Sequence, residues 1–522
     1  MLRRNNPLLL PVCAMLLAGL SFPAIAQITC TASTVPRLAR TAGNTEPVGD
    51  IVLSCTGGTP TPAGSLVPQI NLTLFLNTNV TSLVAEHTAA GPDFSEALLV
   101  IDEPNRGGPN GPPATPLLNC GNIGAPDNGP LGPGICEITS TGDPTQTYDG
   151  TQFTPFSSCT LIGATFVGIA NYGCGRPNAF QGFVASTPEL DNVINFKGIP
   201  FDPPGPGATR TLRITNIRAN AAVFGAGGPH VIEADIAESG STSFTISPTV
   251  LSVAFSEDGL IPSALPGVIH LEEGYASAFT YKNVAFALAN ATPGSVPYPY
   301  IAGDVNYPAD AAQNVPGLLY FTEGGFEWQN NGVNGPPSPD PAPGYGSGIV
   351  TTTNFPLFSA AYGGLNTGIA GAGVASAGTR IALIFTALGE SVTVPNVVNL
   401  FRAGSPAPPS GVMVATITDP NGAGPFVAAP GVSTTVHNFG EVVYEVLYSD
   451  PFAIEFANVP VAISGPLHEA LVAPLLAPFY VNPAARFETP TTAHPAPTAI
   501  PRFGIVNPKV IVLKSPPGSS VP

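Results

Sequence analysis

The sequence predicts an all-β protein made of two or three tandem β-sandwich domains, Ig-like or jelly-roll-like, with long Gly/Pro-rich loops. Several short segments alternate apolar and polar residues with a period of two, which is typical of half-buried strands. The 522 residues include 58 glycines and 61 prolines, which disfavour long helices and favour turns between short strands. Only residues 467–476 show a helical pattern, and Pro474 would interrupt a helix there.

The clearest strand pattern covers residues 69–77, where one face carries Ile70, Leu72, Leu74 and Leu76. Residues 209–217 repeat the alternation. There we expect Leu212 and Ile214 to face the core, and Thr211, Arg213 and Thr215 to face water. Further strands are predicted at residues 50–54, 379–388 and 391–394.

Residues 441–448 and 452–456 form the best hairpin candidate. The first segment would turn Val442, Tyr444, Val446 and Tyr448 inward and Glu441 and Glu445 outward. Residues 449–451, Ser-Asp-Pro, are typical of a turn between two strands.

The N-terminus has the pattern of a signal peptide over residues 1–26. Arg3 and Arg4 precede an apolar run at residues 8–20, and Ala24-Ile25-Ala26 forms a cleavage site, so the mature chain would begin at Gln27. The alternative is a buried N-terminal helix. No other segment predicts a transmembrane span.

The cysteine count of the mature chain predicts disulfides, because exported proteins fold under oxidising conditions. Pairing between neighbours along the chain is favoured over the other arrangements, although six buried free thiols remain an alternative. The predicted pairs are Cys30–Cys55, Cys120–Cys136 and Cys159–Cys174.

Turn-rich joins divide the mature chain into predicted domains. A disulfide-containing β domain would cover residues 27–247, a second β domain 248–370 and a third 371–482. Residues 483–522 would form a Pro-rich, partly disordered tail.

Five runs of residues resemble a group of large exported β-rich proteins from acidobacteria. The runs lie at residues 49–58, 76–82, 211–221, 273–279 and 445–451, and the likeness extends over residues 27–480. The resemblance implies export and a β-rich fold, and it implies no activity, ligand or catalytic residue.

Composition and motifs argue against several functions. The net charge of −17 would repel nucleic acid. The chain carries no nucleophile elbow, H-E-x-x-H motif, Walker loop or EF-hand loop, and its histidines are scattered singly. We therefore expect no cofactor and no metal site.

Two sets of residues could bind or cleave a glycan. Glu323 and Glu327 would face the same way on a strand or a helical turn, and they lie beside Trp328, the only tryptophan. Glycosidases use such an acid pair, but an exposed loop would have the same pattern. Tyr298 and Tyr300 could present two rings on one side of an extended segment, or they could cover a sheet edge.

These observations favour an exported, non-catalytic structural or adhesive protein, secreted or on the cell surface. One alternative is a carbohydrate-binding module protein that uses Tyr298, Tyr300 and Trp328. The other is a secreted glycan hydrolase built on Glu323 and Glu327. The expected partners are a surface glycan or further copies of the chain, which would join through sheet edges.

Overall fold

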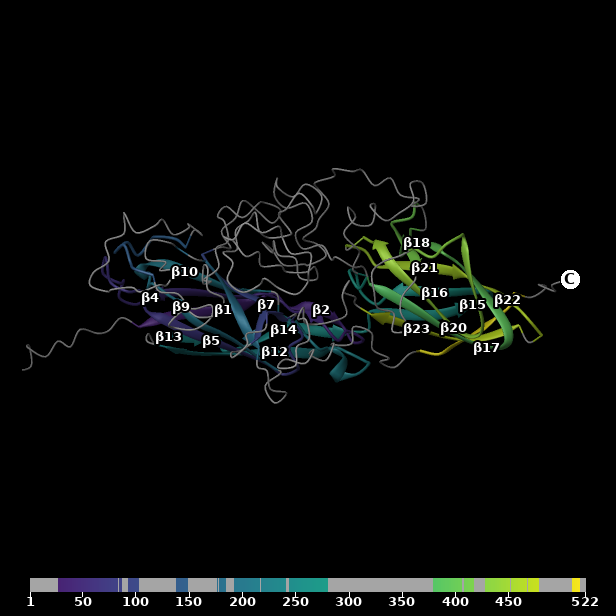
Figure 1. The fold of residues 1–522 in the computed structure, drawn as a ribbon, viewed down its shortest axis with the longest axis horizontal. Coiled ribbons are helices and arrows are strands. Elements are labelled where there is room, and N and C mark those ends of the chain that lie inside the picture. The colour runs from purple at the N-terminus through teal and green to yellow at the C-terminus, as the bar shows by residue number, and fades with distance from the viewer. Residues whose placement is uncertain are drawn as a thin grey trace, which may run out of the picture.

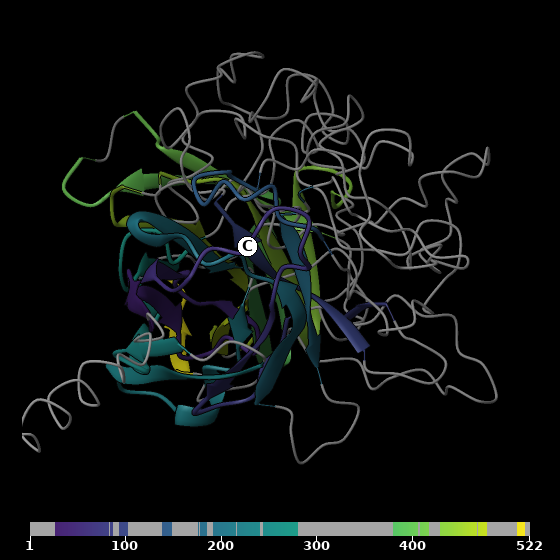
Figure 2. The ribbon, with the colours of Figure 1, turned by 90° about the vertical axis from the view of Figure 1, so that its left-hand side faces the viewer.

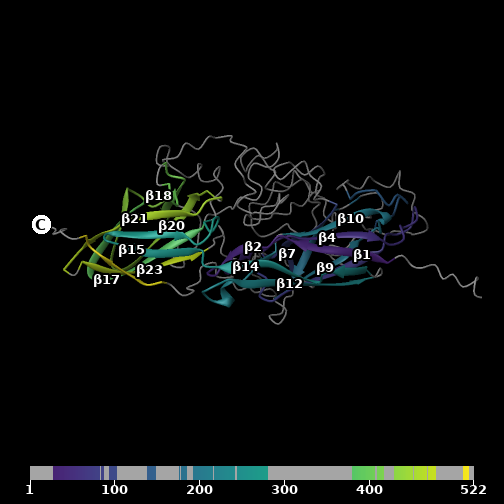
Figure 3. The same cartoon turned by 180° about the vertical axis from the view of Figure 1, so that it is seen from behind.

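The computed structural model describes residues 27–102, 138–148, 176–279, 379–416, 428–477 and 509–516, with short gaps inside these ranges. Their regular structure is nearly all β, which confirms the predicted fold class; the described helical structure is the 3-10 turn η2 (Ala222–Phe224). The strands form two large sheets that lie end to end along the long axis (Figure 1), and the view from behind shows the same arrangement (Figure 3).

The first sheet contains twelve strands of the N-terminal half, and a two-stranded sheet joins β3 (Glu46–Pro47) to β11 (Arg218–Ala219). In spatial order the twelve strands are β13 (Phe244–Ser247), β1 (Ile28–Thr34), β4 (Ile51–Gly57), β10 (Gly205–Thr215), β7 (Asp93–Ile101), β8 (Ala179–Val184), β9 (Val193–Pro200), β5 (Gln69–Leu76), β12 (His230–Gly240), β14 (Val250–Glu257) and β2 (Arg37–Arg40), with β6 (Val84–Glu86) beside β7.

The two ends of this sheet meet. Strands β1 and β2 belong to one extended segment, and β13 and β14 belong to another. The two segments pair in parallel twice, through β1 with β13 and through β2 with β14. The sheet therefore wraps around its apolar core, and Figure 2 shows the purple and teal strands arranged around a centre when viewed along the long axis.

The second sheet contains ten strands and follows the first sheet after a two-residue link, Asp258-Gly259. Its spatial order is β15 (Leu260–Leu265), β16 (Val268–Glu273), β21 (Glu455–Pro460), β18 (Val397–Arg402), β19 (Gly411–Thr416), β20 (Ser433–Tyr448), β17 (Arg380–Pro395), β23 (Glu469–Ala477) and β24 (Ile511–Lys514), with β22 (Ala462–Ser464) beside β17. Its ends also approach each other, because the Gly267 N–H donates to the Lys514 carbonyl over 3.0 Å.

Strand pairing shows which sheet each strand near the predicted domain boundaries belongs to. Strand β14 belongs to the first sheet, whereas β15 and β16 pair with strands that follow residue 379. Strand β24 lies within the predicted tail. The three-domain division stays a prediction.

Strand β5 matches its predicted pattern, since Ile70, Leu72, Leu74 and Leu76 are all buried. Strand β10 differs, because Arg213 and Thr215 are buried as well as Leu212 and Ile214. Asp50 explains this difference: its carboxylate lies 2.7 Å from Arg213 Nε and accepts a 2.9 Å hydrogen bond from the Thr215 hydroxyl.

Three expectations in the second half are wrong. Strands β20 and β21 do not pair as a hairpin, because β17 and β19 occupy both edges of β20. Glu445 is fully buried rather than exposed. The helical candidate at residues 467–476 lies in strand β23, where Pro474 stands opposite Leu383 and the burial alternates from Ala470 to Val472.

Candidate functional site

The two sheets meet at a buried, polar junction. The Thr41 hydroxyl donates to the Asp258 carboxylate over 2.7 Å, and the Thr41 N–H donates to the Glu257 carbonyl over 2.9 Å. Gly259 lies in the two-residue link between the sheets. A Cβ at Gly259 would lie 2.6 Å from Leu476 and 2.7 Å from Arg40, so glycine permits the close approach of both sheets.

Arg40, the last residue of β2, lies at the centre of this junction and is buried. Its Nε lies 3.0 Å from both carboxylate oxygens of Glu46, and its Nη2 lies 2.9 Å from Glu46 Oε1. Its Nη1 donates to the Ala278 carbonyl over 3.1 Å and to the Thr379 hydroxyl over 2.7 Å. Ala278 and Thr379 flank the second sheet, so one arginine of the first sheet holds both segments.

Tyr275 is buried beside the same ion pair. Burial raises the pKa of Tyr275, the Glu46 carboxylate raises it further, and Arg40 lowers it. The Tyr275 phenol therefore stays neutral, and its ring contributes to a junction from which water is excluded.

A pair of buried glutamates lies at the ends of β16 and β21, close to the junction. Glu273 accepts hydrogen bonds from the Phe279 N–H over 2.6 Å and from the Glu455 N–H over 2.9 Å. Burial raises the pKa of Glu273, although these two hydrogen bonds oppose the effect. Glu273 thereby ties β16 to the chain at residue 279 and to β21.

Glu455 has a distinct environment. Its Oε2 accepts a hydrogen bond from the Asp450 N–H over 2.8 Å. Burial raises the pKa of Glu455 to about 7; the Ser410 hydroxyl and Arg402 oppose this shift and the Asp450 carboxylate adds to it. Such a carboxyl changes its charge near neutral pH.

A second ion pair, Arg380 with Glu445, joins β17 to β20. Arg380 Nη2 lies 3.0 Å from Glu445 Oε2, and both side chains are fully buried. The two residues stand directly opposite each other in the antiparallel register, so the ion pair fixes the alignment of these strands.

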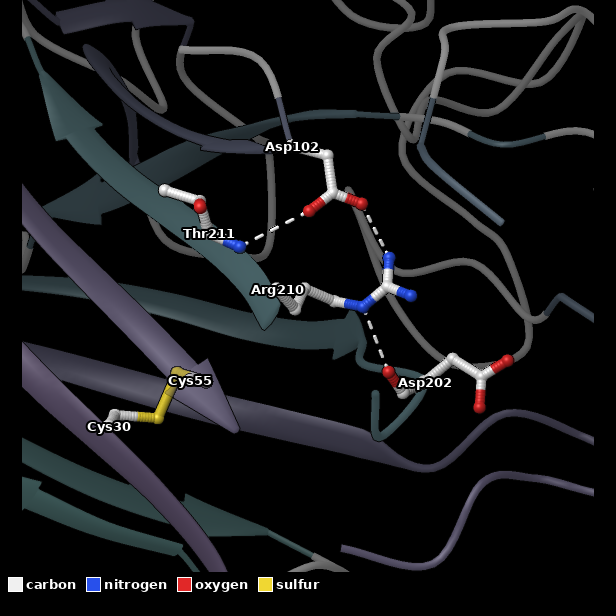
Figure 4. Close-up of a disulfide and its surroundings, with 6 residues drawn as sticks. All are labelled: Cys30, Cys55, Asp102, Asp202, Arg210 and Thr211. Atoms are coloured by element: carbon white, nitrogen blue, oxygen red, sulfur yellow. Dashed lines mark hydrogen bonds and ion pairs between the residues drawn. A yellow bond between two sulfur atoms is a disulfide. The ribbon is translucent and has the colours of Figure 1, made fainter. Parts of the chain in front are cut away.

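The first sheet contains a comparable network near its disulfide (Figure 4). Arg210 Nη1 lies 2.6 Å from the Asp102 carboxylate, and Arg210 Nε donates to the Asp202 carbonyl over 2.9 Å. The Arg210 guanidinium also lies 4.6 Å from the centre of the Tyr148 ring. Burial raises the pKa of Tyr148 to about 12 and raises the pKa of Asp102 despite its ion pair.

The predicted Cys30–Cys55 disulfide is present. The two cysteines stand directly opposite each other on β1 and β4 and are fully buried. The other predicted site residues lie outside the described residues: Cys120, Cys136, Cys159, Cys174, Tyr298, Tyr300, Glu323, Glu327 and Trp328.

Sequence reasoning missed the buried ionic residues. The sequence pattern does not point to Arg40, Glu46, Arg380 or Glu455, since alternation alone assigns a charged residue to the solvent-exposed face of a strand. A signal exists, because only 10% of the residues are charged. In such a chain, a charged residue within a strand segment is a candidate for a buried ion pair.

The described residues contain neither a candidate membrane-spanning helix nor a candidate metal cluster. None of their helices is long and apolar enough to cross a membrane. They contain no group of three or more His, Cys, Asp or Glu side chains that could hold a metal ion.

No family model and no curated protein matches the sequence. Among solved structures, the chain is similar to the C-terminal domain of the AgI/II polypeptide BspA from Streptococcus agalactiae, at 8% identity and a TM-score of 0.22, over 86% of this chain and 95% of that chain. A structure titled BspA_C_mut gives 8% identity and a TM-score of 0.21, over 86% of this chain and 93% of that chain. At these scores we draw neither fold nor function from the likeness.

Proposed function

We propose that the mature chain is an exported, non-catalytic protein with a structural or adhesive role, secreted or on the cell surface. The observation that carries this proposal is the junction at Arg40, which couples the two large sheets through buried, directional contacts. Such contacts hold the two sheets in one relative orientation, which suits a structural or adhesive protein that presents a fixed surface.

Export is supported by the disulfide and by the sequence. The Cys30–Cys55 bond is typical of proteins that fold in an oxidising compartment. The signal-peptide pattern at residues 1–26 gives an independent reason to expect the same compartment.

The proposal is tested in the organism that encodes the chain. Antibody labelling of intact cells and of the culture medium locates the protein, and a deletion strain is compared with the parent for attachment under flow. We expect labelling outside the cytoplasm, weaker attachment of the deletion strain, and full restoration by the intact gene. A gene carrying Arg40→Met should be exported but restore attachment incompletely. A cytoplasmic location, or a deletion without effect on attachment, would overturn the proposal.

The hydrolase alternative rests on Glu323 and Glu327 and stays a prediction. Glu323→Gln should abolish any hydrolysis of glycans by the purified chain, because the general acid would be lost. The same substitution should leave a structural or adhesive protein unchanged.

A further inference from the structure

Three rings form a row across neighbouring strands on the outer face of the second sheet. The rings of His270 on β16 and Phe456 on β21 have centroids 5.2 Å apart, and those of Phe456 and Phe401 on β18 have centroids 5.8 Å apart. These strands lie side by side in Figure 1. All three side chains are half-buried, so part of each stays in contact with solvent.

The row results from strand register. Phe456 stands directly opposite Phe401 on one side and Glu272 on the other, and Glu272 stands opposite Ile261 on β15. Residues paired in this way point to the same face of a sheet. Ile261, which is 43% exposed, therefore extends the apolar part of this face.

Hydrogen-bonding groups border the rings. His270 Nδ1 lies 2.8 Å from the Oδ1 atom of Asn458, and His270 Nε2 lies 3.7 Å from the Glu272 carboxylate. Asn458 is exposed, and the side chain of Glu272 is 39% exposed. The buried Oδ1 of Asn399, two residues before Phe401 on β18, has no hydrogen-bond partner among the described residues.

We propose that this ring row, His270–Phe456–Phe401, binds a neutral glycan. Sugar rings present apolar C–H faces, which stack on aromatic rings, and hydroxyl groups, which bond to amide, imidazole and carboxylate groups beside them. The net charge of −17 disfavours polyanionic glycans. Proline-rich peptides also dock on aromatic surfaces, but the polar groups of Glu272, His270 and Asn458 beside the rings favour a ligand rich in hydroxyls.

This inference names a ligand for the adhesive form of the proposed function, and its biological meaning rests on that function. The site itself is tested with the purified full-length mature chain. Native gels containing soluble neutral polysaccharides (mannan, galactomannan, xyloglucan or mixed-linkage β-glucan) measure binding as retarded migration.

We expect at least one polysaccharide to retard the wild-type chain. Phe456→Leu and Phe401→Leu remove a ring but keep an apolar side chain, and each should weaken binding at least about ten-fold. Phe439→Leu is the matched control, because Phe439 is 70% exposed on β20, outside the ring row. Thermal melting of each variant checks that it is folded.

Three results would overturn the proposal: no retardation by any polysaccharide, equal retardation of a folded Phe401→Leu/Phe456→Leu double variant, or binding of a proline-rich peptide in place of every polysaccharide. If the purified chain bound no polysaccharide, the cell-attachment test of the proposed function would still be valid. A cytoplasmic location would overturn the proposed function even if the purified chain bound a polysaccharide.

Discussion

The guanidinium of Arg40 and the hydroxyl of Thr379 lie 2.7 Å apart although 339 residues separate them along the chain. The same guanidinium holds Glu46 and the Ala278 carbonyl. The orientation of the two sheets therefore depends on one buried side chain and its partners.

Arg40→Met should destabilise the protein and uncouple the two sheets. The substitution removes the bonds to Ala278 and Thr379 and leaves the Glu46 carboxylate buried without its cation, which costs about 3–5 kcal/mol. Calorimetry should show a lower melting temperature and a transition that separates into two.

Arg402→Met is the control for Arg40→Met. Arg402 also forms an ion pair, with Asp450 at 2.6 Å, but its side chain is 49% exposed. Asp450 is 16% exposed, but the guanidinium is half in water, so the pair should contribute about 1 kcal/mol and this variant should melt much closer to the wild type than Arg40→Met. Equal melting of the two variants would contradict the role given to Arg40.

Replacement of both Cys30 and Cys55 by alanine should lower the free energy of unfolding by about 3 kcal/mol, since the disulfide closes a loop between residues 25 positions apart. Urea denaturation of the variant and of the oxidised wild type measures the change. A midpoint that is unaffected by the substitution would show that strand pairing alone holds β1 to β4.

Arg210→Lys should loosen residues 144–148. Lysine keeps the positive charge near Asp102, but it lacks the planar fork through which Arg210 donates to the carbonyls of Pro144 at 3.3 Å and Gln146 at 3.2 Å. Hydrogen exchange should accelerate in these residues and remain unchanged in β17 of the second sheet. Unchanged exchange at residues 144–148 would mean that a positive charge at position 210 is enough to hold these residues in place.

The sequence predicts strands well where burial is purely apolar, and less well where charges are buried. The alternation in β5 predicts both the strand and its inward face, since every inward residue is aliphatic. The same rule fails at Arg213 and Glu445, because each pairs with an oppositely charged residue from a distant segment. The ring row could not be predicted from the sequence either, since His270, Phe401 and Phe456 come together only through strand register.

Glu455→Gln should reduce the dependence of stability on pH. Burial raises the pKa of Glu455 to about 7, above the value of about 4.3 in an unfolded chain. Between these values the folded state binds more protons than the unfolded state, so stability should fall as the pH rises through this window. Glutamine is neutral at every pH and can still accept the hydrogen bond from the Asp450 N–H.

Urea denaturation at pH 5 and at pH 8 measures this effect. The wild type should lose more stability between the two pH values than Glu455→Gln, and the variant should be the more stable of the two at pH 8. Glu273→Gln is a useful contrast, because each carboxyl oxygen of Glu273 accepts a hydrogen bond from a backbone N–H. Glutamine has only one oxygen, so one of these two N–H groups would face an amide NH₂ and lose its hydrogen bond. That variant should be destabilised at both pH values. An identical pH dependence in Glu455→Gln and the wild type would contradict the raised pKa.

The mature chain, Gln27 to Pro522, should be a monomer in solution. The sequence alone favours association through sheet edges, because few charges protect the strands. In the first sheet, β1 pairs with β13 and β2 pairs with β14, so the two ends of the sheet lie together. In the second sheet, the Gly267 N–H donates to the Lys514 carbonyl between the two ends. These pairings occupy part of the backbone edge through which another copy would join. Size exclusion with light scattering should give the mass of one chain, which would favour an adhesive role over a polymeric scaffold. A homogeneous polymer would show instead that copies associate through another surface, and it would favour the structural form of the proposed function.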